Sequence, residues 1–267
     1  MPNPAVADPA PRFRFVLTPL DQVVPWGGEE PRLHWFGLTD GWYWIDLGNH
    51  ELLRYSPQTL HRHRAGGGTT EQPYVDYYVA RLWEDLLGLG AILRHRVPDD
   101  LVEFVAGSSS IWQSLDDDDA TVDAALTWYS DHILDLGYLR RAPRIRAWRT
   151  SDEQRDLVTM TWRHQPSDDI QFTAPTTGQV TVAADAFLAA IRHFDSELLT
   201  AMDDRIRALE QAGPPAGIHL DLDHLRREHD DRATWLERRL AHDPDPAPEW
   251  DTVRAGVRRL HTDPTRR

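Results

Sequence analysis

Hydrophobic and polar positions along this chain follow two periods, and their order predicts a mixture of antiparallel strands and amphipathic helices. Residues 12–17 alternate arginine with large apolar side chains, which is typical of a strand with one buried face. Residues 33–47 are rich in aromatic side chains around Asp40-Gly41, a pair that favours a tight turn, so we predict a β-hairpin there. Residues 51–55 extend this antiparallel meander. Residues 57–70 show no period and are predicted to form a mobile loop.

The middle of the chain changes to helical spacing. Pro73 is predicted to be the first residue of a helix whose apolar positions recur as far as Leu93. A second helix is predicted over 99–105 and a third over 120–136, with the following glycine as its C-terminal cap. The Asp116–Asp119 run precedes this third helix and complements its dipole, an interpretation we prefer to a calcium site because the ligand spacing of an EF-hand is absent.

A period of two then returns before the longest helical pattern of the chain. Residues 144–163 predict a second hairpin, and strands at 170–172 and 180–182 are expected to extend its sheet. Residues 187–209 place large apolar side chains along one stripe until Gly213 ends the pattern. This segment is predicted to be a helix that packs on the sheet.

These elements predict an α+β fold in which one or more antiparallel sheets are packed by amphipathic helices. Residues 1–11 are expected to form a disordered tail, and residues 12–213 the main α+β domain. Residues 214–267 begin at a Pro-Pro linker and are predicted to form a C-terminal helical appendage, with helices over 223–241 and 250–260.

The composition excludes several kinds of chemistry. The chain has 267 residues and no cysteine, which excludes disulfides, thiolate metal sites and a cysteine nucleophile. It also has no lysine, so all 29 basic residues are arginine, and neither a Schiff-base lysine nor a P-loop lysine is present. GC-rich coding sequence is the simplest explanation for this preference.

The net charge of −14 and the pI near 5.3 argue against nucleic-acid binding and favour a basic protein partner. The alternative is that acidity only keeps the protein soluble. No apolar run is long enough to span a membrane, and the N-terminus lacks the regions of a signal peptide. We therefore expect a cytoplasmic protein that does not bind membranes. The sequence does not indicate an oligomeric state.

The aromatic segment supplies the first candidate binding residues. Trp42, Trp44 and Asp46 share one face of the predicted strand, while the residues between them share the other, so both faces are largely apolar. One interpretation is a central strand covered on both sides. The other is a ligand or partner surface that also includes Trp35 and Asp40, since tryptophan is enriched at interfaces. Asp40 has the simpler alternative role of forming the turn.

Arginine supplies the second candidate site. Arg144 and Arg146 lie on one face of a predicted strand, and Arg12, Arg14 and Arg163 are candidates to join them. Paired guanidinium groups hold a carboxylate or phosphate bidentately, although the chain's own acidic residues are alternative partners.

No motif indicates a metal, a cofactor or a catalytic residue. His219, Asp221 and Asp223 offer nitrogen and oxygen ligands, but Asp223 is explained more simply as a helix cap, and neither HExxH nor Glu-x-x-His is present. The serines at 108–110 lack a nucleophile elbow, and the glycines at 66–68 lack the context of a phosphate-binding loop. We therefore predict no cofactor.

Two segments carry a family resemblance. Residues 33–46 (LHWFGLTDGWYWID) and 81–86 (RLWEDL) resemble a family of uncharacterised actinobacterial proteins, a domain of unknown function, and the similarity spans most of the chain. The resemblance implies a bacterial cytosolic setting and no mechanism, so no catalytic residue follows from it.

Two classes of function remain open. The first, which we favour, is a non-catalytic binding or regulatory protein, in its most specific form an immunity-like inhibitor of a basic partner. The alternative is an enzyme or small-ligand-binding protein whose pocket uses Asp40, Asp46 and the arginines without a recognisable signature.

Overall fold

The first sheet is centred on the aromatic strand β2. A computed structural model describes residues 9–65, 72–107, 119–152, 155–167, 169–241 and 249–261. In it, β2 pairs antiparallel with β1 along one edge and with β3 and β4 along the other. The bounds of these strands are Arg12–Leu17 for β1, Asp40–Asp46 for β2, Glu51–Leu52 for β3 and Val75–Tyr78 for β4.

The predicted hairpin turn at Asp40-Gly41 is wrong. Residues Gly37–Thr39 form a 3-10 turn, and Asp40 begins β2, which pairs with β1 from the start of the chain. Gly41 is needed for another reason, because a Cβ there would lie 2.3 Å from the carbonyl oxygen of Val16. The glycine therefore permits the close approach of β1, and the turn propensity of the pair is overridden by sheet pairing.

Two further predictions in this half are corrected. Residues Pro57–Ala65 form helix α1 where we predicted a mobile loop, and residues 66–70 of that loop lie outside the described residues. The helix predicted from Pro73 instead begins at Val79, as α2 (Val79–Ile92), because Val75–Tyr78 pairs with β2 as a strand. Aromatic side chains in β4 favour the sheet despite the preceding proline.

The second sheet has the strand order β5-β6-β7-β8 and is antiparallel throughout. Its strands are Ile133–Leu134 (β5), Arg144–Ser151 (β6), Asp156–Arg163 (β7) and Thr177–Ala183 (β8). The predicted β6–β7 hairpin is confirmed, as is the strand at 180–182. The predicted strand at 170–172 is wrong, because Phe172 pairs in an isolated bridge with Tyr55 and stacks on its ring, and Gln171 bonds to Thr59 of α1.

Helix α4 (Ala120–Asp131) is shorter than predicted. It begins as expected at Asp119, whose carboxylate accepts hydrogen bonds from the backbone of Thr121 (2.8 Å) and Val122 (3.3 Å). Asp116–Asp118 lie outside the described residues. The helix ends before residue 136 because Ile133 and Leu134 pair with β6, so the glycine at 137 is not its cap.

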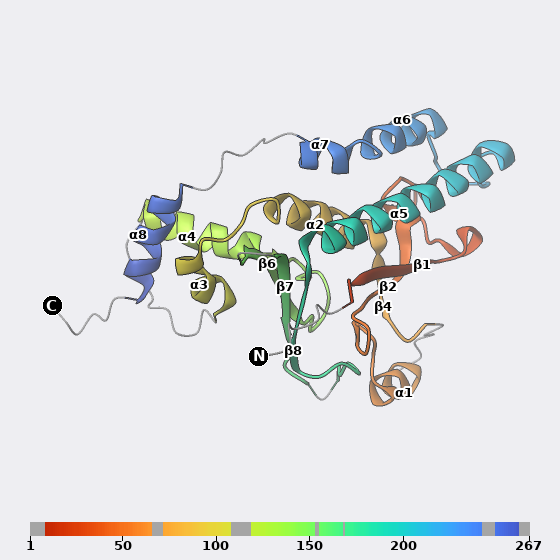
Figure 1. Ribbon diagram of the computed structural model, residues 1–267. Helices are drawn as coiled ribbons and strands as arrows, with labels where there is room; N and C mark the ends of the chain where they lie inside the picture. Colours follow the sequence, from red (N-terminus) through yellow and green to blue (C-terminus); the bar gives the residue numbers. More distant parts are fainter. Residues whose placement is uncertain are drawn as a thin grey trace.

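Helix α5 (Ala184–Ala212) is confirmed as the main packing helix. It runs across the middle of the molecule and contacts both sheets (Figure 1). Phe187 and Phe194 are buried, and each meets the ring of Phe13 in β1 edge to face, with centroids 6.1 Å apart. The same helix packs on the inner face of β7 and β8. Gly213 ends it with φ of 77°, a conformation that favours glycine.

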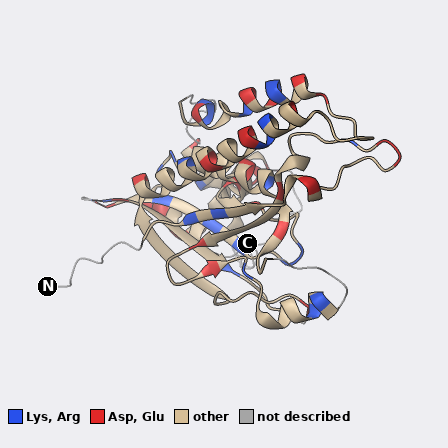
Figure 2. Cartoon of the chain, turned by 90° about the vertical axis from the view of Figure 1, so that its right-hand side faces the viewer, with Lys and Arg blue, Asp and Glu red and all other residues tan. Residues whose placement is uncertain are grey.

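The C-terminal helices separate into two groups. Helices α6 (Leu222–Arg232) and α7 (Trp235–Ala241) replace the single helix predicted over 223–241 and pack on α5 and α2. The guanidinium of Arg232 lies between the rings of Trp35 and Trp235, 4.3 Å and 4.5 Å from their centroids. Figure 2 shows acidic and basic residues interleaved along α5 and the helices beside it.

Helix α8 (Trp250–His261), predicted over 250–260, packs at the other end of the molecule (Figure 1). It lies against α4 and, with α3 (Val102–Ala106) and Trp148 of β6, encloses a second apolar core. A 3-10 turn at Asp99–Leu101 leads directly into α3. The two together correspond to the helix predicted over 99–105. Sheet two therefore has α5 on its inner face and part of this second core on its outer face.

The buried stripe of α5 generates a stability prediction. Phe194→Ala should lower the free energy of unfolding by about 3–5 kcal/mol, because it leaves a cavity among the rings of β1. Arg192→Ala, at an exposed position of the same helix, should change it by less than about 0.5 kcal/mol. Guanidinium denaturation midpoints measure both values, and equal effects would contradict the packing of α5 described above.

The docking of α8 rests on one glycine. A Cβ at Gly256 would lie 2.0 Å from the carbonyl oxygen of Thr121 in α4, so Gly256→Ala should push α8 off α4. Hydrogen exchange in α8 should become faster while exchange in α5 stays unchanged. Ala255→Gly, one position along, lowers helix propensity without adding volume and is the matched control; a similar loss of protection in that variant would show that Gly256 has no special role.

Candidate functional site

The outer face of sheet one carries the predicted aromatic residues. In β2, Tyr43 and Ile45 are fully buried, whereas Trp42, Trp44 and Asp46 on the opposite face are half-buried. Antiparallel register places other side chains on this same outer face. We call it the aromatic face, and it consists of Trp42, Trp44, Tyr74, Tyr78 and Val16 with the carboxylates of Asp40, Asp46, Glu51 and Asp76 and the guanidinium groups of Arg12, Arg14 and Arg54.

A stacked ring pair forms the centre of the aromatic face. The rings of Trp44 and Tyr74 lie 3.9 Å apart and are nearly parallel, at 8°. The Tyr74 hydroxyl donates to Glu51 at 2.9 Å, and Glu51 also pairs with Arg54. Because Tyr74 is fixed at both its ring and its hydroxyl, the stack is held in place before any partner binds.

The exposed large apolar side chains come from residues 16–26 of the chain. Among the residues that the structure describes, the large apolar side chains found exposed are Val16, Val24 and Trp26, at 38%, 76% and 44%. The Trp26 indole donates to the Tyr78 hydroxyl at 2.7 Å, which joins it to the aromatic face. All three exposed side chains therefore come from one short segment of the chain, whereas single exposed apolar residues are normally scattered over a protein surface.

The carboxylates of this face differ in how they are held. Asp40 accepts a hydrogen bond from the Thr18 hydroxyl at 2.7 Å, and Asp46 accepts one from the backbone of Gly48 at 3.2 Å. Burial raises the pKa of Asp76, while the nearby His63 opposes this shift. Asp40 is therefore a strand residue with a fixed side chain, and its predicted role in a tight turn is wrong.

Trp35 does not lie on the aromatic face. It is fully buried beneath α6, where its indole donates to Nδ1 of His229 at 3.3 Å. Its ring also contacts Trp83, with centroids 5.6 Å apart, and the Arg232 guanidinium. The structure thus gives Trp35 contacts within the core and separates it from Trp42 and Trp44.

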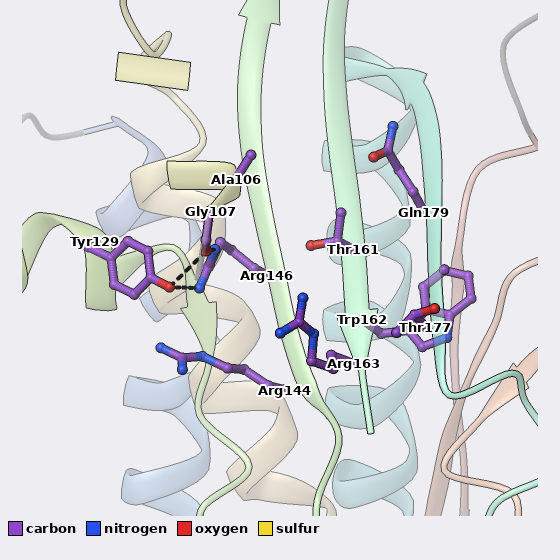
Figure 3. A pocket seen from close by; sticks show the side chains of 11 residues that line it. Ala106, Gly107, Tyr129, Arg144, Arg146, Thr161, Trp162, Arg163, Thr177 and Gln179 are labelled. Carbon is purple, nitrogen blue, oxygen red and sulfur yellow. Dashed lines mark hydrogen bonds between the residues drawn. The ribbon is translucent and has the colours of Figure 1, made fainter. Parts of the chain in front are cut away.

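The predicted arginines divide between the two sheets. Arg144, Arg146 and Arg163 line one pocket of about 390 Å³ on the outer face of β6–β8, and this arginine pocket also includes Tyr129 of α4 (Figure 3). Arg12 and Arg14 belong to β1 in the other sheet.

Arg146 is the most constrained of the three arginines in the pocket. It is 6% exposed, and one amino group donates to the carbonyl oxygens of Val105 (2.5 Å) and Gly107 (2.6 Å). The other amino group donates to the Tyr129 hydroxyl, whose ring centroid lies 4.1 Å from the guanidinium carbon. The end of α3 and the last turn of α4 therefore fix this side chain from two directions.

One buried carboxyl network has no counterpart in the sequence analysis. Tyr43 donates to the hydroxyl of Tyr138 at 3.2 Å, and Tyr138 bonds to Asp85 of α2. Burial raises the pKa of Asp85 to about 7, and Arg81 opposes the shift. The spacing of apolar residues does not single out Asp85, because Asp85 is one of the few polar residues in the largely apolar helix α2.

The other predicted clusters have structural explanations. Asp221 caps α6 by accepting a hydrogen bond from the backbone of His224 at 2.8 Å, where we had assigned the cap to Asp223. Throughout the described ranges, no group of three histidine, aspartate or glutamate side chains is arranged to hold a metal ion. Nor does any helix in those ranges have the length and apolar character needed to cross a membrane. The serines at 108–110 and the glycines at 66–68 lie outside the described residues.

Comparison with protein families gives one match. The model of a family of unknown function, DUF5984, matches residues 12–256. The chain belongs to the DUF5984 family. No curated protein and no solved structure matches it. The family resemblance inferred from the aromatic segments is thus confirmed at the level of a domain of unknown function, and the function of this DUF5984 member must be argued from its own residues.

The Asp85 network predicts a pH dependence of stability. The pKa of Asp85 is raised from 3.8 to about 7 on folding, so the native state binds a proton that the unfolded chain releases between these values. The stabilisation by this group is complete below pH 3.8 and is lost as the pH rises through 7.

Asp85→Asn removes this titration. Its free energy of unfolding should decline less than that of the wild type between about pH 4 and pH 7, the window between the two pKa values. Asp123→Asn, on the exposed side of α4, should retain the wild-type pH dependence. Urea denaturation across this range measures the difference, and identical slopes for Asp85→Asn and wild type would rule out the shifted titration.

Proposed function

We propose that this protein is a non-catalytic binding protein, in its most specific form an immunity-like inhibitor, that recognises a basic protein partner through the aromatic face. The observation that carries the proposal is the stacked Trp44–Tyr74 pair on a face that also carries carboxylates and the exposed Val16, with the exposed Trp26 bonded to Tyr78 of the same face. Tryptophan and tyrosine are the side chains that most often dominate the binding energy of protein interfaces.

The rigidity of the aromatic face supports this proposal. Association costs free energy when interface side chains lose rotamer freedom, at about 0.5–1.5 kcal/mol for each flexible side chain. Trp44, Tyr74 and Trp26 are already fixed by stacking or hydrogen bonds. A partner that covers them gains apolar burial without that cost.

The charge of the molecule supports a basic partner. Four carboxylates and three arginines lie on the aromatic face, one of them, Arg54, paired with Glu51, and the whole chain carries a net charge of −14. Partner arginines or lysines would find both carboxylates and aromatic ring faces there. The field of the acidic molecule would also speed the encounter at low salt. We expect this meeting to occur in the cytoplasm of an actinobacterium.

The test begins with capture of the partner by tagged wild-type protein from an actinobacterial lysate, followed by binding kinetics with the purified partner. Trp44→Ala should weaken binding by about 2 kcal/mol, roughly thirty-fold in Kd, because it removes the centre of the face. Trp26→Ala is a second variant, whose side chain is exposed enough to be removed without unfolding the protein. Circular dichroism verifies the fold of each variant.

Trp250→Ala is the matched control, because Trp250 is a half-buried tryptophan on α8 at the opposite end of the molecule (Figure 1). It should leave Kd unchanged. The association rate should fall as added salt shortens the Debye length towards about 10 Å at 0.1 M. Equal losses for Trp44→Ala and Trp250→Ala, or an association rate indifferent to salt, would refute a basic partner on this face.

A further inference from the structure

The arginine pocket is unusual in an acidic protein because its lining contains three arginines and no acidic side chain. The chain has 43 aspartate and glutamate residues, and arginines elsewhere pair with them readily. Within the part of the chain that the structure describes, no carboxylate forms an ion pair with Arg144, Arg146 or Arg163. The positive charge of this pocket is therefore not balanced by neighbouring side chains there.

Strand register holds the three arginines together. Arg144 pairs directly with Arg163 across β6 and β7, and Arg146 pairs with Thr161 on the same face. Like charges at directly opposed positions of an antiparallel pair are destabilising. Figure 3 shows the three side chains on the same side of the hairpin as Tyr129. The guanidinium carbon of Arg144 also lies 5.4 Å from the centroid of the Tyr129 ring.

The buried arginine has an unused donor. Both amino groups of Arg146 are occupied by carbonyl and hydroxyl oxygens, but its Nε has no hydrogen-bond partner among the described residues. A buried unsatisfied donor costs about 1–3 kcal/mol, and more when the group is charged. Burial lowers the pKa of Arg146, and Arg144 and Arg163 lower it further while Tyr129 opposes them. An anion in the pocket would relieve the repulsion among the three guanidinium groups.

We propose that the arginine pocket binds the phosphate group of a small molecule, with the exposed Arg144 and Arg163 as its ligands and the positive charge of the buried Arg146 beside them. A phosphate offers several oxygens in different directions, which suits donors that converge from two strands better than the single plane of a carboxylate does. The lining continues past the arginines with Thr161, Thr177 and Gln179, whose neutral polar groups suit the rest of such a molecule. This site is separate from the aromatic face and does not depend on the partner proposed for it.

Isothermal titration with inorganic phosphate and with phenyl phosphate tests the site, with succinate as the carboxylate probe. Arg144→Gln and Arg163→Gln are the test variants, because both side chains are exposed and their guanidinium groups form no hydrogen bond or ion pair among the described residues. Each should raise the Kd for phosphate at least about ten-fold, the loss expected for one charge-assisted contact. Arg12→Gln, an exposed strand arginine in the other sheet, changes the net charge equally and should leave the Kd unchanged.

A direct readout comes from the Arg146 side chain. In a proton–nitrogen NMR spectrum, its Nε–H resonance should shift when phosphate is added and stay in place in Arg144→Gln and Arg163→Gln. Tighter binding of phenyl phosphate than of inorganic phosphate would show that the pocket accepts the organic part as well. Phosphate binding that is equal in wild type, Arg12→Gln and Arg163→Gln, or succinate binding as tight as phosphate binding, would overturn the proposal.

Discussion

The position of helix α5 between the two sheets is the constraint on which the rest of the structure depends. Its apolar stripe extends from Phe187 to Leu209, far longer than one small sheet needs. The rings of Phe13 and Phe15 cover the part facing β1, and the inner face of β7 and β8 covers another part. One helix thus fixes both sheets, and each sheet is left with one face directed away from it.

Those two outer faces differ in chemistry. On sheet one, the strand alternation of β2 that buries Tyr43 and Ile45 in the core leaves Trp42 and Trp44 half-exposed among carboxylates and arginines, side chains of both signs of charge. On sheet two, the alternation that buries Ile145 and Ala147 directs arginines outward from β6 and β7. Helices α3, α4 and α8 cover only part of that second face, and the edge of their cover forms the arginine pocket. Both candidate surfaces therefore follow from the same period-two pattern.

The sequence predicted well the elements formed by residues near one another in the chain. It predicted poorly which distant strands pair with each other. Helix α5, the β6–β7 hairpin and the Asp119 cap each depend on residues near one another in the chain, and each is confirmed. The prediction for Asp40-Gly41 was wrong because a glycine that favours a turn also suits a strand that another backbone approaches closely. The approaching backbone is β1, which is distant in the sequence, so the local pattern does not reveal it.

The candidate sites show the same limit. Arg144 and Arg146 could be placed on one face from their spacing alone, and β7 brings Arg163 to them through the hairpin register. Arg12 and Arg14 have the same spacing but lie in the other sheet, which only the tertiary fold decides. Asp85 was missed entirely, because its raised pKa results from burial beside Tyr138 and not from any motif.

The distribution of ion pairs separates structural arginines from the candidate binding arginines. Arg226 joins α6 to α5 through Asp203 and Glu210, and Arg149 pairs with Asp156 while donating to carbonyl oxygens at the end of α2. In both cases a partner carboxylate repays part of the desolvation of the guanidinium. Arg146 is more buried than either, yet its contacts are neutral oxygens and other arginines surround it. This contrast is informative because the chain contains no lysine, so the side chains compared are all arginines with the same geometry and the same capacity to form ion pairs. The difference therefore lies in what the fold places around each one, and around Arg146 it places a cavity.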